Sequence, residues 1–325
     1  MSLRGQLLQL LADGRFYSGD ELGRTLGISR SAVWKHIQFL QARQLDIYAV
    51  RGRGYRLAQP LDLLSRQLII KNMDHEAVAR LARLDVLTEV DSTNAFLMAR
   101  ARNGGVSGEV CVAEYQSAGR GRLGRAWVSP FARNVYLSLL WQFPCGAEAL
   151  GGLGLAIGVS ILRAIQALGG QAVRLKWPND LVCEDRKLAG VLLEMNMDGT
   201  GGCNVVIGVG LNVRMPAPVS GLIDQPWTDL EQVLGRPLSR NQVVAGLLQH
   251  MLHDVAQFQA HGLQPFMDDW RRYDNLLGRP VSLSTLGESV SGIACGIDEQ
   301  GALLLGHNGR TQRYLAGDVS VRVSV

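Results

Sequence analysis

The chain has 325 residues, of which 47% are hydrophobic and 19% are charged, an ordinary composition for a globular protein with two or three domains. The first residues lack the long apolar run of a signal peptide, and the longest uncharged apolar stretch, residues 149–162, is too short and too rich in glycine to span a bilayer. We therefore expect a folded cytoplasmic protein with no membrane partner.

The five cysteines are odd in number, widely spaced and without a CxxC pair, so we expect reduced, mostly buried thiols rather than disulfides or a zinc site. His250 and His253 are three residues apart, a spacing that metal ligands can use, but no Cys or acidic partner stands at ligand spacing. These two histidines are interpreted as packing or surface residues, and no metal site is predicted.

The net charge of +4 is concentrated at the N-terminus. Residues 1–66 contain ten Lys or Arg against five Asp or Glu, a net charge of +5, whereas the remainder has 23 against 24. The N-terminal segment would therefore attract an anionic partner.

Three short helices are predicted within this basic segment. The first spans Arg4–Ala12, where leucines recur at helical spacing. An S-x-x-E capping box at Ser18 opens a second helix that Gly27 ends, and Ser29 can cap a third. The pattern indicates a helix, a tight turn and a second helix.

The third helix presents polar and cationic side chains opposite its apolar face, as the recognition helix of a DNA-binding domain does. Two β-prone runs around Arg51-Gly52-Arg53-Gly54 then predict a hairpin with a basic tip, so the unit resembles a winged helix. The alternative is a three-helix unit that only packs against a partner. The residues expected to contact DNA are Arg30, Ser31, Trp34, Lys35, Gln38, Arg51 and Arg53.

A new core is expected beyond a boundary at residues 59–66, where the hairpin ends and a new helix begins. Six β-like runs alternate there with helical stretches at Ser92–Asn103 and Leu150–Leu168, and several runs are close enough for hairpins. The predicted sheet is mixed and largely antiparallel, so the fold class is α+β. The runs are residues 84–90, 109–115, 134–141, 172–177, 188–195 and 204–213.

The segment EYQSAGRGRLGRAW, residues 114–127, interleaves three glycines with three arginines. Gly119, Gly121 and Gly124 satisfy GxGxxG, but Pro130 follows and the chain leads into another strand, so a dinucleotide site is disfavoured. A Walker loop is absent. The loop offers backbone N–H groups and guanidinium forks to phosphate or carboxylate oxygens, and we expect an anionic ligand to order it.

The last part of the chain follows a helical region at residues 242–273. It combines period-two strands with turn signals at Leu286-Gly287, Asp298–Gly301 and Asn308-Gly309. This pattern predicts a small β-barrel.

Four motifs resemble the biotin protein ligases, in the bifunctional bacterial form that is also the biotin operon repressor. They are DSTN (91–94), the glycine-arginine segment (114–127), KWPND (176–180) and KLAG (187–190), in the family's order and spacing. The resemblance implies a multidomain α+β protein. Its expected domains are a winged helix-turn-helix at 1–66, a catalytic domain at 67–273 and an SH3-like domain at 274–325.

In that family, biotin and ATP form biotinyl-5′-AMP, and the biotinyl group passes to a lysine of a biotin carboxyl carrier domain. The resemblance implies catalytic roles for Lys187, Arg120, Arg122 and Asp180. It implies biotin contacts from Ser92, Thr93, Asn94, Gln116, Arg120, Gly121, Arg122, Trp127, Lys187 and Gly190. It implies ATP or adenylate contacts from Arg120, Arg122, Arg125, Lys176, Asn179, Asn212 and Trp227, with Mg²⁺ entering on ATP.

The sequence leaves three interpretations of Asp180 open. It could orient Lys187 or help to deprotonate the acceptor lysine, and a carboxylate after this turn can also be a simple cap. Leu123 departs from relatives that carry a basic residue there, which leaves the three loop arginines in place.

Three other functions remain as alternatives. A lipoyl ligase shares the adenylation logic, although KWPND with GRGR favours biotin. A ligand-sensing repressor without catalysis is disfavoured by Lys187 and Asp180, and a ligase with a non-regulatory head is disfavoured by the basic wing. The hypothesis for regulation is that biotinyl-AMP promotes a homodimer that binds a two-fold operator.

Overall fold

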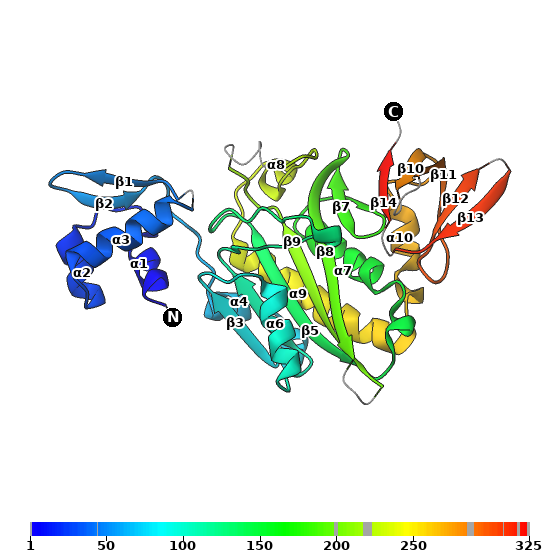
Figure 1. Ribbon diagram of the computed structural model, residues 1–325, viewed down its shortest axis with the longest axis horizontal. Helices are drawn as coiled ribbons and strands as arrows, with labels where there is room; N and C mark the ends of the chain where they lie inside the picture. The colour runs from blue at the N-terminus through cyan, green and yellow to red at the C-terminus, as the bar shows by residue number, and fades with distance from the viewer. Residues whose placement is uncertain are drawn as a thin grey trace.

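The computed structural model describes residues 2–43, 45–197, 201–216, 223–284, 289–307, 309–316 and 319–323. A central seven-stranded sheet with helices on both faces lies between a small helical domain and a small β domain (Figure 1). The two small domains contact opposite sides of the central one.

The N-terminal domain has three helices followed by a two-stranded antiparallel sheet. The elements are α1 (Leu3–Leu11), α2 (Gly19–Leu26), α3 (Arg30–Gln41), β1 (Ile47–Val50) and β2 (Gly54–Leu57). The predicted caps are confirmed, since the Ser18 and Ser29 hydroxyls accept from the amides of Glu21 and Ala32. Gly27 ends α2 in the left-handed region with a φ of 67°.

This domain meets the central one through a polar contact and an apolar one. Arg4 and Arg43 both donate to the Glu89 carboxylate, at 3.1 and 2.9 Å. Phe131 of the central domain is buried among the leucines of the N-terminal core. The N-terminal domain is therefore packed against the central domain as well as connected to it by the chain.

The central sheet has the strand order β3-β4-β5-β9-β8-β7-β6. Only β3 and β4 are parallel among these neighbours, which confirms a mixed, largely antiparallel sheet. The strands are β3 (Arg83–Leu87), β4 (Glu109–Ala113), β5 (Val135–Phe143), β6 (Arg174–Lys176), β7 (Asp180–Cys183), β8 (Arg186–Met197) and β9 (Cys203–Leu211).

Helices cover the two faces of this sheet unequally. The long helices α7 (Leu153–Ala167) and α9 (Arg240–His261) form the main core on one face. On the other face, α6 (Thr93–Arg102) packs against only part of the sheet. Four shorter helices complete the domain, of which α5 and α8 were not predicted: α4 (Arg66–Lys71), α5 (His75–Arg80), α8 (Leu230–Leu234) and α10 (Met267–Tyr273).

Alternation along β9 explains why other side chains can approach the second face closely. Ile207 and Val209 point into the main core, whereas Val206 packs under α6. The next residues on the α6 face are Gly208 and Gly210, which have no side chains. Their bare backbone forms a floor, which we call the glycine floor. The candidate site lies over this floor.

One apolar helical stretch, Ala147–Ala167, is long enough to cross a membrane by length and composition among the described residues. Of its apolar 18-residue window, 67% is buried inside the protein, where α7 packs against α9 and the sheet. We therefore interpret it as the central core helix.

The C-terminal domain is a five-stranded antiparallel sheet of order β13-β12-β11-β10-β14. The predicted turn at Asp298–Gly301 is confirmed by a 3.0 Å backbone hydrogen bond between these two residues. The predicted turn at Leu286-Gly287, and Asn308 of the third, fall outside the described residues. The strands are β10 (Pro280–Ser284), β11 (Ser289–Ile297), β12 (Leu303–His307), β13 (Arg310–Tyr314) and β14 (Ser320–Val323).

Candidate active site

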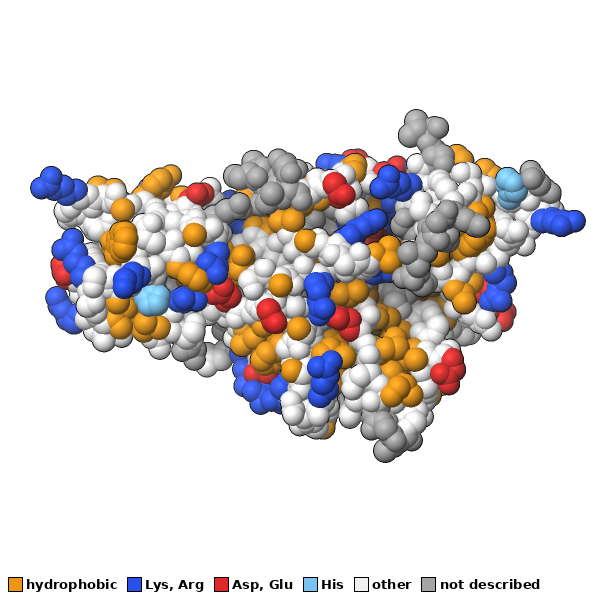
Figure 2. Space-filling view, in the orientation of Figure 1, with side chains coloured by type: hydrophobic (Ala, Val, Ile, Leu, Met, Phe, Trp, Pro, Cys, Tyr) orange, Lys and Arg blue, Asp and Glu red, His pale blue; other side chains and the backbone are white. Residues whose placement is uncertain are grey.

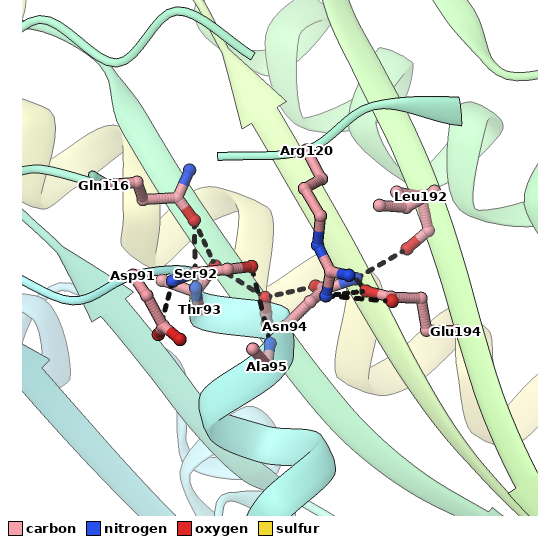
Figure 3. A network of polar contacts seen from close by, with 10 residues as sticks. Asp91, Ser92, Thr93, Asn94, Ala95, Gln116, Arg120, Leu192 and Glu194 are labelled. Atoms are coloured by element: carbon pink, nitrogen blue, oxygen red, sulfur yellow. Dashed lines mark hydrogen bonds and ion pairs between the residues drawn. The ribbon is translucent and has the colours of Figure 1, made fainter. Parts of the chain in front are cut away.

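The start of α6 carries the polar end of the site. The Ser92 hydroxyl accepts from the Ala95 amide and caps the helix. The Gln116 side-chain oxygen accepts from both the amide and the hydroxyl of Thr93, at 2.9 and 3.1 Å (Figure 3). Gln116 follows β4, so two loops that are distant in sequence are joined at one point.

Asn94 is held by two residues that the sequence reasoning missed. Its oxygen accepts from the Ser138 hydroxyl at 2.6 Å, and its amide donates to Glu194 at 2.8 Å. Arg120 reaches the same Glu194 carboxylate, at 3.1 Å (Figure 3). The period-two pattern of the strands could have placed Ser138 and Glu194 on a sheet face, but their partner depends on strand order.

The glycine-arginine loop folds back on itself as a short hairpin. The Gly121 amide donates to the Arg125 carbonyl at 2.7 Å, and the Trp127 amide donates to the Gly119 carbonyl at 2.9 Å. Leu123, at the turn, has a left-handed φ of 56° and an exposed side chain. The Arg125 side chain is also exposed, so the structure does not bring it into the polar network.

Trp127 covers the glycine floor. A Cβ at Gly210 would lie 2.4 Å from the Trp127 ring, and one at Gly208 would lie 2.3 Å from the Asn94 oxygen. Neither glycine was predicted, although their alternation in VVIGVGL is a visible signal. The indole nitrogen of Trp127 is buried without a hydrogen-bond partner among the described residues, which suits a ligand that supplies an acceptor.

Lys187 and Asp180 form the charged centre. The Lys187 ammonium lies 2.7 Å from the Asp180 carboxylate and 5.5 Å from the centre of the Trp127 ring. Both charged side chains are mostly buried, so their attraction is screened less than at the surface. A Cβ at Gly190 would come within 3.3 Å of the Lys187 ammonium and 3.4 Å of Asp180, so glycine there leaves room for the pair.

The KWPND segment lies beside this pair. Asp180 begins β7, after a Trp177–Pro178 peptide bond that is cis. The Asn179 oxygen accepts from Arg122 at 3.2 Å, which links the segment to the loop. Burial lowers the pKa of Lys176, with the neighbouring Lys187 charge acting in the same direction.

Arg122 also reaches the C-terminal domain. Its guanidinium donates to the Val319 carbonyl at 3.3 Å and to the Ala316 carbonyl. Backbone oxygens between β13 and β14 therefore hold the guanidinium group of Arg122.

The two remaining expected ATP contacts lie close to Lys187. The backbones of Trp227 and Lys187 form a parallel β-bridge. The Lys187 amide donates to the Pro226 carbonyl, and the Lys187 carbonyl accepts from the Thr228 amide. Asn212 is buried and donates to the Thr228 carbonyl at 3.0 Å. These contacts bring both residues to the same end of the sheet as the Lys187–Asp180 pair.

The side chains that we expect to bind DNA are exposed. Trp34 is 52% exposed on α3, and Arg53 stacks on Phe16 at 4.2 Å at the hairpin tip. Figure 2 shows that basic side chains predominate over acidic ones on the visible face of this domain. The full set is Arg30, Ser31, Trp34, Lys35, Gln38, Arg51 and Arg53.

The cysteines and histidines supply no metal site within the ranges that the structure describes. No group of three or more His, Cys, Asp or Glu side chains there is arranged to hold an ion. All five cysteines are free, and His253 faces Glu76 at 3.6 Å on the surface.

Three comparisons agree with this arrangement. Residues 87–212 match the biotin/lipoate A/B protein ligase family, residues 4–56 an HTH domain and residues 276–322 the biotin protein ligase C-terminal domain. The chain is 41% identical over 317 residues to the bifunctional ligase/repressor BirA of Escherichia coli (strain K12), covering 98% of this chain and 96% of the relative.

A second relative and a solved structure support the same assignment. The Bacillus subtilis (strain 168) bifunctional ligase/repressor BirA is 32% identical over 328 residues, covering 98% of this chain and 99% of the relative. The biotin protein ligase from Aquifex aeolicus in complex with biotin and ATP is 29% identical, with a TM-score of 0.64 over 75% of this chain and 100% of that one. The chain therefore belongs to the biotin protein ligase family.

Proposed function

We propose that the protein is an ATP-dependent biotin protein ligase that also represses transcription. The observation that carries this conclusion is the Lys187–Asp180 pair beside Trp127, in a chain similar over nearly its whole length to bifunctional ligase/repressors. The enzyme would form biotinyl-5′-AMP and transfer biotin to a lysine of a biotin carboxyl carrier domain.

The domains would divide this work. We assign residues 1–66 to a winged helix-turn-helix, 67–273 to the catalytic domain and 274–325 to an SH3-like domain. The β1–β2 hairpin after three helices supports the first assignment, and the five-stranded antiparallel sheet supports the last.

Adenylation requires cations that are fixed beside the reacting groups. A biotin carboxylate oxygen attacks the α-phosphorus of ATP, and pyrophosphate leaves, so negative charge accumulates where two anions meet. Lys187 is our first catalytic residue, because its ammonium is held in place by Asp180 in a mostly buried setting. Arg120 and Arg122 would exchange Glu194 and the C-terminal carbonyls for ligand oxygens.

Biotin would lie over the glycine floor. Its ureido ring would be met by the short polar groups at the start of α6, and its apolar part by Trp127. The unpartnered indole nitrogen supports this placement, as do Gly208 and Gly210, which let Asn94 and Trp127 lie directly against the strand. The proposed contacts are Ser92, Thr93, Asn94, Gln116, Arg120, Gly121, Arg122, Trp127, Lys187 and Gly190.

ATP would lie on the KWPND side of Lys187. The hydrogen bond between Asn179 and Arg122, and the position of Asn212 and Trp227 around Lys187, support this side. Mg²⁺ would enter with ATP and be held by its phosphate oxygens. Arg125 would join only if the loop rearranges, since its side chain is exposed here. The proposed ATP contacts are Arg120, Arg122, Arg125, Lys176, Asn179, Asn212 and Trp227.

Transfer of biotin needs a neutral acceptor amine. That amine attacks the acyl carbon, AMP leaves, and the amine loses its proton. The 2.7 Å contact between Asp180 and Lys187 favours the orienting role for Asp180 over the role of base.

Repression would use the exposed face of α3 and the basic hairpin tip to contact DNA. It would also require a dimer, which would form along β8. β7 pairs with β8 only as far as Gly190, so the later part of β8 pairs with β9 alone among the described residues. Met195 and Met197 on that part are 41% and 54% exposed. An edge of this kind can pair with a second copy, and the acceptor would compete for it.

The first test is biotin-dependent exchange of labelled pyrophosphate into ATP, with lipoate and octanoate as controls. Exchange with biotin alone establishes adenylation, whereas exchange with lipoate would identify a lipoyl ligase. No exchange from folded protein would leave a ligand-sensing repressor. Operator DNA is then titrated at fixed salt with and without biotin plus ATP, and equal affinities would refute the corepressor role.

A further inference from the structure

The turn that precedes Lys187 has an unusual backbone for its sequence. Glu184 and Asp185 join β7 to β8 and have left-handed φ values of 51° and 59°. Two-residue hairpin turns of this kind favour Gly, Asn and Asp, so Glu184 is the unusual residue, because longer side chains are crowded in the left-handed region. Contacts from outside the hairpin would therefore stabilise this turn.

The C-terminal domain supplies that hold. Arg279, just before β10, donates to both oxygens of the Asp185 carboxylate, at 2.8 and 2.9 Å. Asn275 donates to the same carboxylate at 2.9 Å. The Arg279 fork is the main cause of a pKa of about 2 for Asp185, below its ordinary 3.8.

Arg279 and Asn275 are themselves anchored. The Asn275 amide donates to the Leu175 carbonyl of β6 at 2.8 Å, and the Arg279 carbonyl accepts from the Ala294 amide of β11 at 3.0 Å. One side of this segment is therefore tied to the central sheet and the other to the C-terminal sheet. The contact at Asp185 is part of a joint between the two domains, although the Asp185 side chain is 54% exposed.

The turn sets the pairing of the first residues of β8, including Lys187, whose backbone is also held by Pro226 and Thr228. Cys183 pairs with Arg186 across the turn, and Val182 then pairs with Lys187. The register shifts immediately afterwards, where Leu181 pairs with Ala189. Because successive side chains in a strand point to opposite faces, a one-residue slip at the turn would turn Lys187 away from Asp180.

We propose that Asp185 and Arg279 are positioning residues, through which the C-terminal domain fixes the turn and thereby holds Lys187 in the active site. The inference rests on the proposed ligase function of that site. It gives the C-terminal domain a second role beside its carbonyl contacts to Arg122.

The test compares Arg279→Gln and Asp185→Gly with the parent in the biotin-dependent pyrophosphate exchange assay. Gln removes the charged fork, whereas Gly removes the carboxylate and suits a left-handed φ, so the turn itself is not disfavoured. Arg310→Gln is the matched control, because Arg310 is exposed on β13 of the same domain. Thermal unfolding checks that each variant is folded.

We expect both variants to lose roughly 10- to 100-fold in kcat, the scale of a misplacement of about 1 Å, while the KM for biotin stays near the parent value. The double variant should lose no more than the single ones, because one joint is broken in each. Arg310→Gln should match the parent.

Three results would overturn the proposal. Parent-like kcat in both variants would show that the joint does not position Lys187. Parent-like kcat in Asp185→Gly alone would show that only the turn conformation matters. A change in KM or in unfolding temperature while kcat stays at the parent value would show that the joint has only a structural role. Absence of exchange in the parent and in Arg310→Gln would instead refute the ligase function itself.

Discussion

Replacing Gly210 with alanine tests whether the bare strand beneath Trp127 forms the ligand site. The new Cβ would lie 2.4, 2.5 and 2.9 Å from three atoms of the Trp127 indole. The strand cannot withdraw easily, since Gly210 pairs with Tyr136 on one side and Gly190 on the other. The indole must therefore move.

The size of the effect follows from the cost of overpacking. Inserting a methyl group into a well-packed site costs about 1–3 kcal/mol. Trp127 ends the glycine-arginine loop. Displacing its indole would relieve the clash, but it would also disturb the proposed biotin site. A loss of that size in biotin binding corresponds to a rise in KM of roughly 5- to 150-fold.

Pyrophosphate exchange at varied biotin concentration measures this rise, with circular dichroism confirming the fold. Gly246→Ala provides a matched control, because a Cβ at Gly246 of α9 meets nothing within 4 Å. That change should leave KM unaltered and stabilise the protein by about 0.5–1 kcal/mol, since glycine is unfavourable within a helix. A folded Gly210→Ala protein with the parent KM and kcat would refute the placement of biotin over β9.

Lys187→Met should lower the exchange rate by about 10²–10³-fold, the cost of removing a fixed group that stabilises developing charge, and Arg125→Ala should lower it far less; equal rates for the parent and Lys187→Met would remove Lys187 from its role. Asp185→Asn should destabilise the protein above about pH 4, where the parent carboxylate is charged in both states, and this difference should shrink as the pH falls toward the folded pKa of about 2. Urea unfolding across that range measures it, and a constant difference would contradict the ion pair. Arg51→Ala and Arg53→Ala should each reduce the salt slope of DNA binding by about 0.9 if each contacts one phosphate, and an unchanged slope would exclude both from the backbone.

Local features of this protein could be predicted from short stretches of sequence. The Ser18 and Ser29 caps, the end of α2 at Gly27 and most central strands depend on residues only a few positions apart, so their signals are contained in the sequence pattern. The DSTN, KWPND and KLAG motifs likewise identify residues that the fold brings together.

Contacts between residues that are distant in the sequence could not be predicted from these short stretches. Asn94 meets Glu194 across 100 positions, and Ser138 joins them only because β5, β9 and β8 are neighbours in the sheet. Asp185 and Arg279 are 94 positions apart. Periodicity assigns each residue to a face of its own strand, but strand order and domain packing select its partner, and these depend on the free energy of the whole core. The sequence by itself thus determined most of the elements and the motif residues, and only the tertiary structure decided which charges and glycines surround them.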